Sequence, residues 1–258
     1  GTGEGLGSGV IYDASGLVLT NAHVVDSART VQVGLADGRT VGGEVLGADQ
    51  GTDIAVVRLI GTEDLPVARL ADEEPRVGQL AVALGSPFGL EQTVTAGIIS
   101  AVDRPVPNDR GIAVNMLQTD APINPGNSGG ALANRNGEVI GINTAIFSQS
   151  GENNGIGFAV PIATASRVAE RIVSGKPIER ARLGIEGNDR GPGPGAVVGR
   201  VVPGGPAAAA GIRAGDRIVS IDGEPVRSFG ALQGEIGTRE PGDTVTLEVE
   251  RDGARLTV

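Results

Sequence analysis

Short apolar runs separated by glycine-rich turns limit what this chain can fold into. It has 43 glycines among its 258 residues, and aromatic residues make up only 2%. Its core must therefore come from valine, isoleucine, leucine and alanine. β-Branched residues favour strands and glycine favours tight turns. Ile54–Leu59 is an almost unbroken apolar run, as in a buried strand, and Val31–Leu35 leads into the hairpin turn Ala36–Arg39. We therefore expect a mostly β protein.

One segment of the chain, Ile123–Gly130, holds a serine among glycines. Because glycine has no Cβ, the backbone can turn tightly there, present Ser128 Oγ and aim the amides of Gly126 and Ser128 at one point. Two convergent amides would form an oxyanion hole, in which each donor contributes roughly 3–4 kcal/mol when water is excluded. In a chain so rich in glycine the segment is also typical of an ordinary turn. Whether Ser128 is a nucleophile therefore depends on finding a general base and a carboxylate elsewhere in the chain.

A serine nucleophile needs a general base, usually histidine, that a carboxylate orients. The single histidine is His23, and Asp53 lies in a short apolar segment further along. Taken alone, a lone histidine is more often structural, and such an aspartate more often belongs to a turn. The order His23, Asp53, Ser128 is that of the chymotrypsin-type triad, which favours a catalytic set. The rival acids, by distance along the chain, are Asp26 and Asp120.

These segments closely resemble the HtrA (Deg) family of serine proteases. The resemblance covers nearly the whole chain and rests on motifs in order at compatible spacing: Thr20–Val25, Thr52–Val56, Thr119–Leu132, Ile140–Ala145 and Gly155–Pro161. It implies a chymotrypsin-like double β-barrel followed by a PDZ domain. It also implies a serine endopeptidase that degrades unfolded or misfolded proteins, with a chaperone-like activity besides, and that needs no cofactor. The alternatives are a catalytically silent binding or holdase protein, and an esterase that uses the same triad.

The clearest helix of the sequence is Pro161–Ser174, with apolar residues at helical spacing and Gly175 after its end. Residues 176–181 then have few apolar side chains and include a proline. We therefore place a protease domain at residues 1–175, a linker at 176–181 and a PDZ domain at 182–258. The matches to a PDZ domain of the HtrA type are Leu183–Ile185, Val202–Ala208, Gly211–Ile218 and Ile221–Gly223.

The PDZ resemblance implies a peptide-binding groove. In such domains the amides of a short loop receive a C-terminal carboxylate, and the peptide adds as a strand at the sheet edge. The resemblance places Leu183, Gly184 and Ile185 at that loop. The groove helix would span residues 228–236, with Ser228 as N-cap. Its apolar face comprises Phe229, Leu232 and Ile236, of which Leu232 is the groove candidate, although the sequence leaves open which residue faces the groove.

The primary specificity pocket has weaker support. In this fold the residue six positions before the nucleophile lies near the base of the pocket, and here it is the uncharged Pro122. A preference for arginine or lysine would therefore lack its counter-charge. By family analogy the apolar walls are Ile123, Ile142 and Phe158. We expect small or medium aliphatic residues before the cleaved bond.

Composition excludes several classes of partner. A formal net charge of −10 offers no field to attract nucleic acid or anionic lipid. Without cysteine the chain has no disulfide or thiolate metal site, and with one histidine it has no multi-histidine metal cluster. No run of 18 apolar residues predicts a transmembrane helix.

The family resemblance also bears on location and assembly. It implies an extracytoplasmic place, in the periplasm, in the cell envelope or secreted. Because the chain begins at Gly1 rather than Met, we expect any signal or membrane anchor to lie before it. The family further implies a homotrimer held by N-terminal segments. Two polar stretches, residues 103–111 and 148–155, are expected to be surface loops of the kind the family uses to form or disorder its active site.

Overall fold

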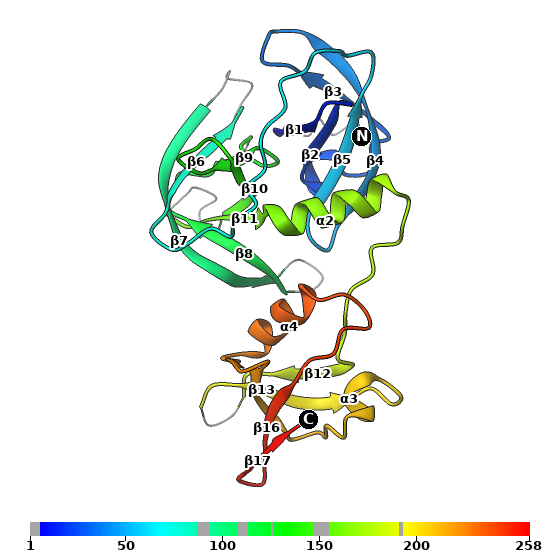
Figure 1. Cartoon of the computed structure of the whole chain (residues 1–258), viewed down its shortest axis with the longest axis vertical. Coiled ribbons are helices and arrows are strands. Elements are labelled where there is room, and N and C mark those ends of the chain that lie inside the picture. The colour runs from blue at the N-terminus through cyan, green and yellow to red at the C-terminus, as the bar shows by residue number, and fades with distance from the viewer. Residues whose placement is uncertain (1–5, 87–92, 108–112, 125, 147–154, 191–192) are drawn as a thin grey trace. The chain divides into compact units, whose positions relative to one another are not determined.

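The computed structural model describes residues 6–86, 93–107, 113–124, 126–146, 155–190 and 193–258. The chain divides into two compact units. The first comprises Gly1–Asp103 with Met116–Ile178, and the second comprises Arg104–Asn115 with Glu179–Val258. Figure 1 shows the elements of both units in chain order.

The first unit begins with a five-stranded antiparallel sheet in the order β1-β2-β5-β4-β3. Its central strand β5 is the predicted apolar run Ile54–Leu59, in which all side chains but Arg58 are buried. A single turn of helix, α1 (Ala22–Val25), follows β2 directly. The other strands are β1 (Val10–Asp13), β2 (Leu17–Thr20), β3 (Thr30–Gly34) and β4 (Thr40–Asp49).

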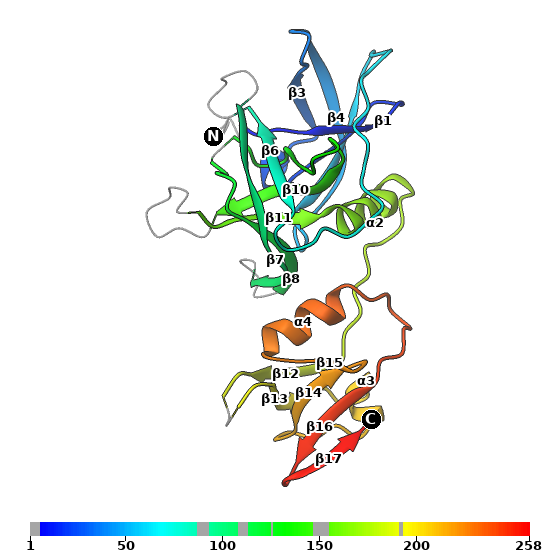
Figure 2. The same cartoon turned by 60° about the vertical axis from the view of Figure 1, so that its left-hand side comes forward.

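A closed barrel in the order β10-β11-β8-β7-β6-β9 follows, and Figure 2 shows it from its β6–β7 side. Small aliphatic side chains fill its interior, among them Ala81, Ala83, Ile99 and Leu132. Its strands are β6 (Leu80–Gly85), β7 (Thr93–Pro107), β8 (Ala113–Thr119), β9 (Ala131–Ala133), β10 (Val139–Ile146) and β11 (Gly157–Pro161).

One expected loop is partly strand. β7 continues through residues 103–107, so the prediction of a loop at 103–111 was wrong for its first five residues. Strands tolerate proline where the ladder does not need its missing N–H. Asp103 also adopts a left-handed conformation, with φ 52°, which bends the strand there. Residues 108–112, and residues 147–154 of the second expected loop, lie outside the described residues.

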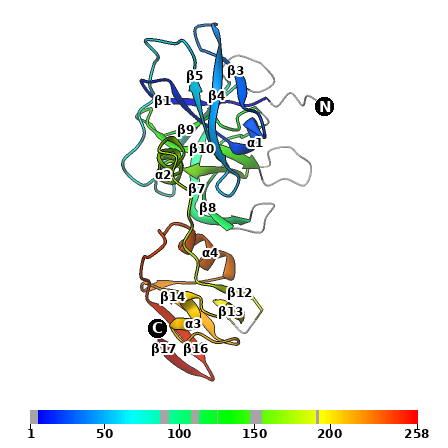
Figure 3. The ribbon, with the colours of Figure 1, turned by 90° about the vertical axis from the view of Figure 1, so that its right-hand side faces the viewer.

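The helix α2 (Ile162–Val173) joins the sheet to the barrel. Pro161 is its N-cap, and its buried residues include Ile162, Ala165 and Val168. The helix contacts β4 and β5 of the sheet and β10 and β11 of the barrel, and Figure 3 shows it along its axis. These contacts form one core cluster that links the two halves of the unit.

The second unit is built on a sheet in the order β12-β13-β14-β16-β17, with β15 paired to β14. Among the described residues, the edge strand β12 pairs with β13 alone. As predicted, Ser228 caps α4, because its Oγ accepts from the Ala231 N–H at 3.0 Å. The elements are β12 (Ile185–Asn188), β13 (Ala196–Val201), α3 (Pro206–Ala209), β14 (Arg217–Ile221), β15 (Glu224–Pro225), α4 (Phe229–Gly237), β16 (Leu247–Arg251) and β17 (Ala254–Thr257).

Within the described ranges, no helix is both long enough and apolar enough to cross a membrane.

Candidate active site

The sheet register brings His23 and Asp53 together. β2 and β5 are antiparallel, and Thr20 at the end of β2 lies opposite Ala55 at the start of β5. The residues that follow β2 therefore lie near the residue that precedes β5. His23 Nδ1 lies 2.8 Å from Asp53 Oδ2, and the His23 N–H donates to Asp53 Oδ1 at 3.0 Å. The Asn21 side-chain amide donates to the Asp53 carbonyl at 2.9 Å. Asp53 is thus fixed through both its backbone and its carboxylate, in a left-handed conformation with φ 59°.

This pairing changes the acid–base behaviour of the imidazole. The hydrogen bond to Asp53 raises the pKa of His23 above its ordinary value, against the opposing effect of partial burial. A carboxylate on Nδ1 selects the tautomer in which Nδ1 carries the proton and Nε2 is the acceptor. Half of the His23 side-chain surface is exposed. The imidazole can therefore take a proton from an incoming group.

A buried carboxylate shapes the turn that leads to Asp53. Asp49 accepts from the Thr52 N–H at 3.0 Å, from Thr52 Oγ at 2.6 Å and from the Gly51 N–H at 3.3 Å. These bonds close the turn directly before Asp53. Sequence reasoning did not identify Asp49. An aspartate three residues before a threonine is nevertheless a typical side-chain-to-backbone turn pattern.

Thr144 connects this pair to Ser128. Its hydroxyl donates to Asp53 Oδ2, and its carbonyl accepts from Ser128 Oγ at 3.2 Å. Thr144 is buried, with 6% of its surface exposed. It lies in β10, so one strand of the barrel touches both the acid and the serine. Sequence reasoning did not identify it, because a threonine in a strand carries no distinctive chemical signal.

The turn that carries Ser128 is held by backbone hydrogen bonds. The Asn127 N–H donates to the Asn124 carbonyl at 3.0 Å, and the Gly130 N–H donates to the Asn127 carbonyl at 2.9 Å. The Gly129 N–H donates to the Asn143 carbonyl in β10 at 2.8 Å. Gly126 adopts φ 102°, a conformation that residues with a Cβ rarely reach.

Close packing explains the two glycines after Ser128. A Cβ on Gly129 would lie 2.2 Å from the Ser8 carbonyl oxygen, and one on Gly130 would lie 2.1 Å from the Leu84 carbonyl oxygen. Neither site has room for a side chain. The glycine-rich turn is therefore required by two neighbouring backbone segments as well as by its own curvature.

Two amides in this turn are available to a ligand. Within the described part of the chain, the N–H groups of Gly126 and Ser128 have no hydrogen-bond acceptor. They are the two donors expected for an oxyanion hole. In the same part of the chain Ser128 Oγ donates to Thr144 rather than to His23. The hydroxyl must therefore turn toward the imidazole before the two can exchange a proton.

The rival acids lie elsewhere. Asp120 Oδ1 accepts from the Ile98 N–H at 2.7 Å, which ties it to β7. Asp26 is exposed and ends α1 with φ 44°. The carboxylate that contacts His23 among the described residues is Asp53.

The four residues expected around a specificity pocket differ in their surroundings. Pro122 is exposed, and its carbonyl accepts from Thr95 Oγ1 at 2.8 Å. Ile123 is 1% exposed and belongs to the core of the barrel. Ile142 is fully buried in the cluster beneath α2, and Phe158 is 7% exposed. The structure thus divides Ile123 and Ile142 between two core clusters.

The loop before β12 in the second unit also presents amides. The Leu183 carbonyl accepts from the Ala207 N–H at 2.9 Å, and the Gly184 carbonyl accepts from the Val202 N–H at 2.8 Å. The N–H groups of Leu183 and Gly184 have no acceptor among the described residues, and Gly184 adopts φ 76°. Ile185 opens the edge strand. The loop therefore presents donors beside a free strand edge.

The helix next to this edge offers Phe229 rather than Leu232. Leu232 is 2% exposed and lies in the core of the unit. A Cβ on Gly187 of β12 would lie 2.6 Å from the ring of Phe229, so this ring packs directly against the strand. Phe229 of α4 therefore lies beside β12.

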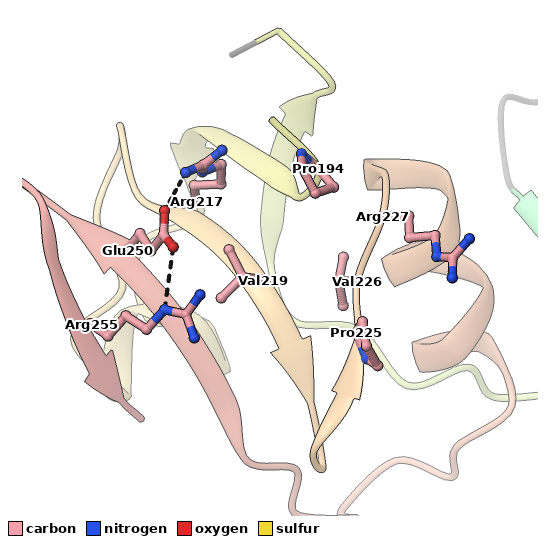
Figure 4. A pocket seen from close by; sticks show the side chains of 8 residues that line it. All are labelled: Pro194, Arg217, Val219, Pro225, Val226, Arg227, Glu250 and Arg255. Atoms are coloured by element: carbon pink, nitrogen blue, oxygen red, sulfur yellow. Dashed lines mark hydrogen bonds and ion pairs between the residues drawn. The ribbon is translucent and has the colours of Figure 1, made fainter. Parts of the chain in front are cut away.

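A separate hollow lies on the face of the sheet formed by β14 and its neighbours (Figure 4). Its floor is apolar, and two arginines at its rim, Arg217 and Arg255, are both paired with Glu250. The hydrogen bond from Arg217 holds the pKa of Glu250 below its ordinary value. These ion pairs satisfy the charges of Arg217, Arg255 and Glu250 internally, while Arg227 also lines the hollow.

No group of three or more histidine, aspartate or glutamate side chains in the described ranges is arranged to hold a metal ion.

Comparison with known proteins agrees with this geometry. The family model for a trypsin-like peptidase domain matches residues 7–142, and the model for a PDZ domain matches residues 179–258. A solved structure, the HtrA-type protease AlgW with decapeptide, is 40% identical with a TM-score of 0.75, covering 98% of this chain and 80% of that chain. This chain belongs to the HtrA family of serine proteases. The predicted HtrA fold class, a mostly β protease domain followed by a PDZ domain, is confirmed.

Named HtrA relatives extend the comparison. The periplasmic pH-dependent serine endoprotease DegQ of Escherichia coli (strain K12) is 45% identical over 267 aligned positions, which cover 99% of this chain and 58% of DegQ. The periplasmic serine endoprotease DegP of Salmonella typhimurium is 45% identical, with 98% of this chain and 56% of DegP covered. The chain thus spans a little over half the length of these HtrA relatives.

Proposed function

We propose that this chain is a serine endopeptidase in which Ser128 is the nucleophile, His23 the general base and Asp53 the residue that orients the imidazole. The observation that carries the proposal is the continuous path of contacts from His23 through Asp53 and Thr144 to Ser128. The names of the relatives, which are serine endoproteases, support the same activity.

The proposed reaction follows from the groups present. Ser128 Oγ turns from Thr144, gives its proton to His23 Nε2 and attacks the peptide carbonyl. Asp53 stabilises the imidazolium that forms. The Gly126 and Ser128 amides then hold the oxyanion, because they have no other acceptor in the described residues. The imidazolium returns the proton to the leaving amine, and water releases the acyl group by the same steps.

We infer that the substrates are unfolded or misfolded polypeptides and that the protein works outside the cytoplasm. The location rests on the relatives, two of which carry the word periplasmic in their names. The substrate class rests on the resemblance to the HtrA family. The domain limits at 1–175, 176–181 and 182–258 belong to the same proposal. Limited proteolysis should cut first within residues 176–181 if that segment is a linker.

The test of the activity is digestion of unfolded casein by the whole chain and by Ser128→Ala. Fragments should form with the first and not with the second, while both give the same thermal melting curve. Cleavage by a folded Ser128→Ala variant would refute the proposal. If neither protein cleaves casein but both keep it soluble on heating, the silent holdase is the correct function. If the intact chain cleaves only ester substrates, it is an esterase.

A second proposed function is the binding of C-terminal peptides by the PDZ domain. The specific observation is the pair of available amides at Leu183 and Gly184, next to the free edge of β12. Such amides can accept a carboxylate while the peptide adds to β12 as a strand. Ile185 would begin the pairing, and Phe229 would contact the peptide side chains.

Calorimetric titration of the Ser128→Ala chain with a peptide that ends in valine tests this binding. The free acid should bind clearly more tightly than the C-terminal amide, because only the acid carries the charge that the loop amides receive. The change Phe229→Ala should weaken both forms by a similar factor. Equal affinity of acid and amide would contradict carboxylate recognition.

We also propose that the chain self-associates, as the family's homotrimer implies. The outer face of β6 and β7 supports this, because it is apolar without interruption. Leu80 is paired with Ile98 and Leu84 with Val94, and these four side chains are 38% to 57% exposed. The mass in solution should be three times that of one chain, and Ile98→Glu should lower it. The control is Val67→Glu, at a residue 45% exposed elsewhere in the unit. A monomer without the substitution would contradict the proposal.

A further inference from the structure

Ser8, close to the start of the described chain, forms hydrogen bonds through its N–H, its hydroxyl and its carbonyl, and two of them reach the turn that carries Ser128. Its N–H donates to the Ser128 carbonyl at 2.7 Å. Its Oγ donates to the Gly126 carbonyl at 2.7 Å and accepts from the Ser86 N–H at 2.8 Å. Its carbonyl accepts from Thr20 Oγ1 at 2.7 Å. One residue thus joins three segments that are distant in the sequence.

The segment around Ser8 is fitted closely to its neighbours. We call residues Gly7–Gly9 the N-terminal strap. A Cβ on Gly7 would lie 2.6 Å from Val24 side-chain carbons and 3.2 Å from the Ser128 carbonyl oxygen. A Cβ on Gly9 would lie 2.6 Å from the Val18 side chain. The strap is therefore in direct backbone contact with the turn, and small shifts of the strap reach Ser128.

The hydroxyl of Ser8 controls one peptide plane in particular. The plane between Gly126 and Asn127 carries the Gly126 carbonyl, which accepts from Ser8, and the Asn127 N–H, which donates to Asn124. Without Ser8 only the second bond holds this plane. Gly126 has no Cβ and adopts φ 102°, so its own side chain does not resist rotation. The Gly126 N–H lies in the preceding peptide plane, which is joined to this one at the Gly126 Cα. A displacement of the Gly126 carbonyl would therefore shift the Cα and move the N–H away from the oxyanion position.

We propose that Ser8 is a positioning residue for the oxyanion hole: its hydroxyl, bound to the Gly126 carbonyl, keeps the Gly126 amide aimed at the reacting carbonyl. The inference rests on the proposed endopeptidase function. It concerns a residue that lies 118 positions from Gly126 in the sequence and that contacts neither His23 nor Asp53 in the described structure.

Loss of the Ser8 hydroxyl should weaken binding of the transition state and not of the substrate. The substrate is bound by other surfaces, so loss of the hydroxyl should leave KM nearly unchanged. The oxyanion forms only during the reaction, and removal of one oxyanion donor lowers kcat by about 10²–10³-fold in other serine proteases. Because displacement of Gly126 removes the donor for part of the time, we expect Ser8→Ala to lower kcat by about 10–100-fold. The pH at which activity rises should not move, since the His23–Asp53 pair is untouched.

The experiment measures kcat and KM on a peptide p-nitroanilide, the pH profile, and the melting temperature for the full chain and its variants. Ser8→Ala should lose kcat with KM and the pH profile unchanged. Ser8→Thr, which keeps a hydroxyl, should recover most of the loss. Ser15→Ala is the matched control, because in the described structure that hydroxyl bonds to Asp13 on an exposed turn, and it should have full activity. If Ser8→Ala does not fold, Ser8→Cys replaces it, since a thiol is similar in size but a weak donor.

Three results separate the inference from the function on which it rests. Unchanged kcat in a folded Ser8→Ala or Ser8→Cys variant would overturn the role of Ser8. A parallel loss of kcat, melting temperature and substrate affinity would also overturn it, because that pattern describes a fold defect. An unsubstituted chain that neither turns over peptides nor reacts at Ser128 with a fluorophosphonate would instead refute the endopeptidase function.

Discussion

Replacement of Thr144 by valine removes one hydroxyl from the active site with almost no change of shape. The Asp53 carboxylate accepts from the His23 N–H, from His23 Nδ1–H and from Thr144 Oγ1. The substitution removes the last of these donors and leaves the buried strand β10 otherwise intact. Its effects should therefore report on the carboxylate alone.

The magnitude follows from the charge of the acceptor. A hydrogen bond to a charged group contributes about 1.5–3 kcal/mol. If the whole amount were lost in the transition state, kcat/KM would fall by about 10–150-fold, which is an upper limit. Without this donor the charge of the Asp53 carboxylate is directed to His23, and the carboxylate is held less firmly against the imidazole. The apparent pKa of His23 should therefore rise further, while weaker orientation of the imidazole should lower the rate.

The assay is kcat/KM for a peptide substrate from about pH 5 to about pH 9. Activity needs the neutral imidazole, so it rises as the pH rises through the pKa of His23. In Thr144→Val this rise should occur at higher pH and reach a lower plateau. Thr144→Ser keeps the hydroxyl and serves as the control. An unchanged profile and rate in Thr144→Val would refute the reasoning that Thr144 supports Asp53.

Two further predictions concern the charged pairs of the two units. In Asp53→Asn the pKa of His23 should fall toward its ordinary value, because the hydrogen bond to Asp53 is what raises it, and kcat should drop by about 10⁴-fold; imidazole proton signals in NMR and steady-state rates measure both. In the second unit, Arg251 is bound through two nitrogens to the buried carboxylate of Asp216, which lowers the pKa of Asp216. Arg251→Met should cost about 3–5 kcal/mol, seen by calorimetry as a fall of about 10 °C or more in the melting of this unit. The stability that Asp216 adds is present above its unfolded pKa of about 3.9 and is lost as the pH falls through its lower folded pKa; a melting point unchanged by the substitution would contradict this account.

Local patterns in the sequence predicted much of the fold. The apolar run Ile54–Leu59 became the buried central strand, and Ser228 became the cap of α4, because each depends on neighbours in the sequence. The extension of β7 to Pro107 was not predicted. Two prolines and several charges are typical of a loop, whereas in the barrel this strand lies between β6 and β8, the strands before and after it in the chain.

The candidate site was predictable in its chemistry but not in its supporting contacts. A histidine, an aspartate and a serine among glycines each carry a chemical signal, whereas Thr144 and Ser8 do not. Thr144 lies 91 positions from Asp53, and Ser8 lies 118 positions from Gly126. A threonine in a strand and a serine near a glycine acquire their roles only from the tertiary fold. Phe229 likewise lies beside β12 because Gly187 leaves room for its ring.

The central claim is that Ser128 reacts as a nucleophile through His23. Its most direct test is the rate of modification by a fluorophosphonate as a function of pH, with the adduct located by peptide mass spectrometry. The account predicts one adduct, on Ser128, whose rate of formation rises with pH along a single transition above about 6.5, the ordinary pKa of histidine. An adduct on another residue, or a rate on Ser128 that is the same in a folded His23→Ala variant, would contradict it.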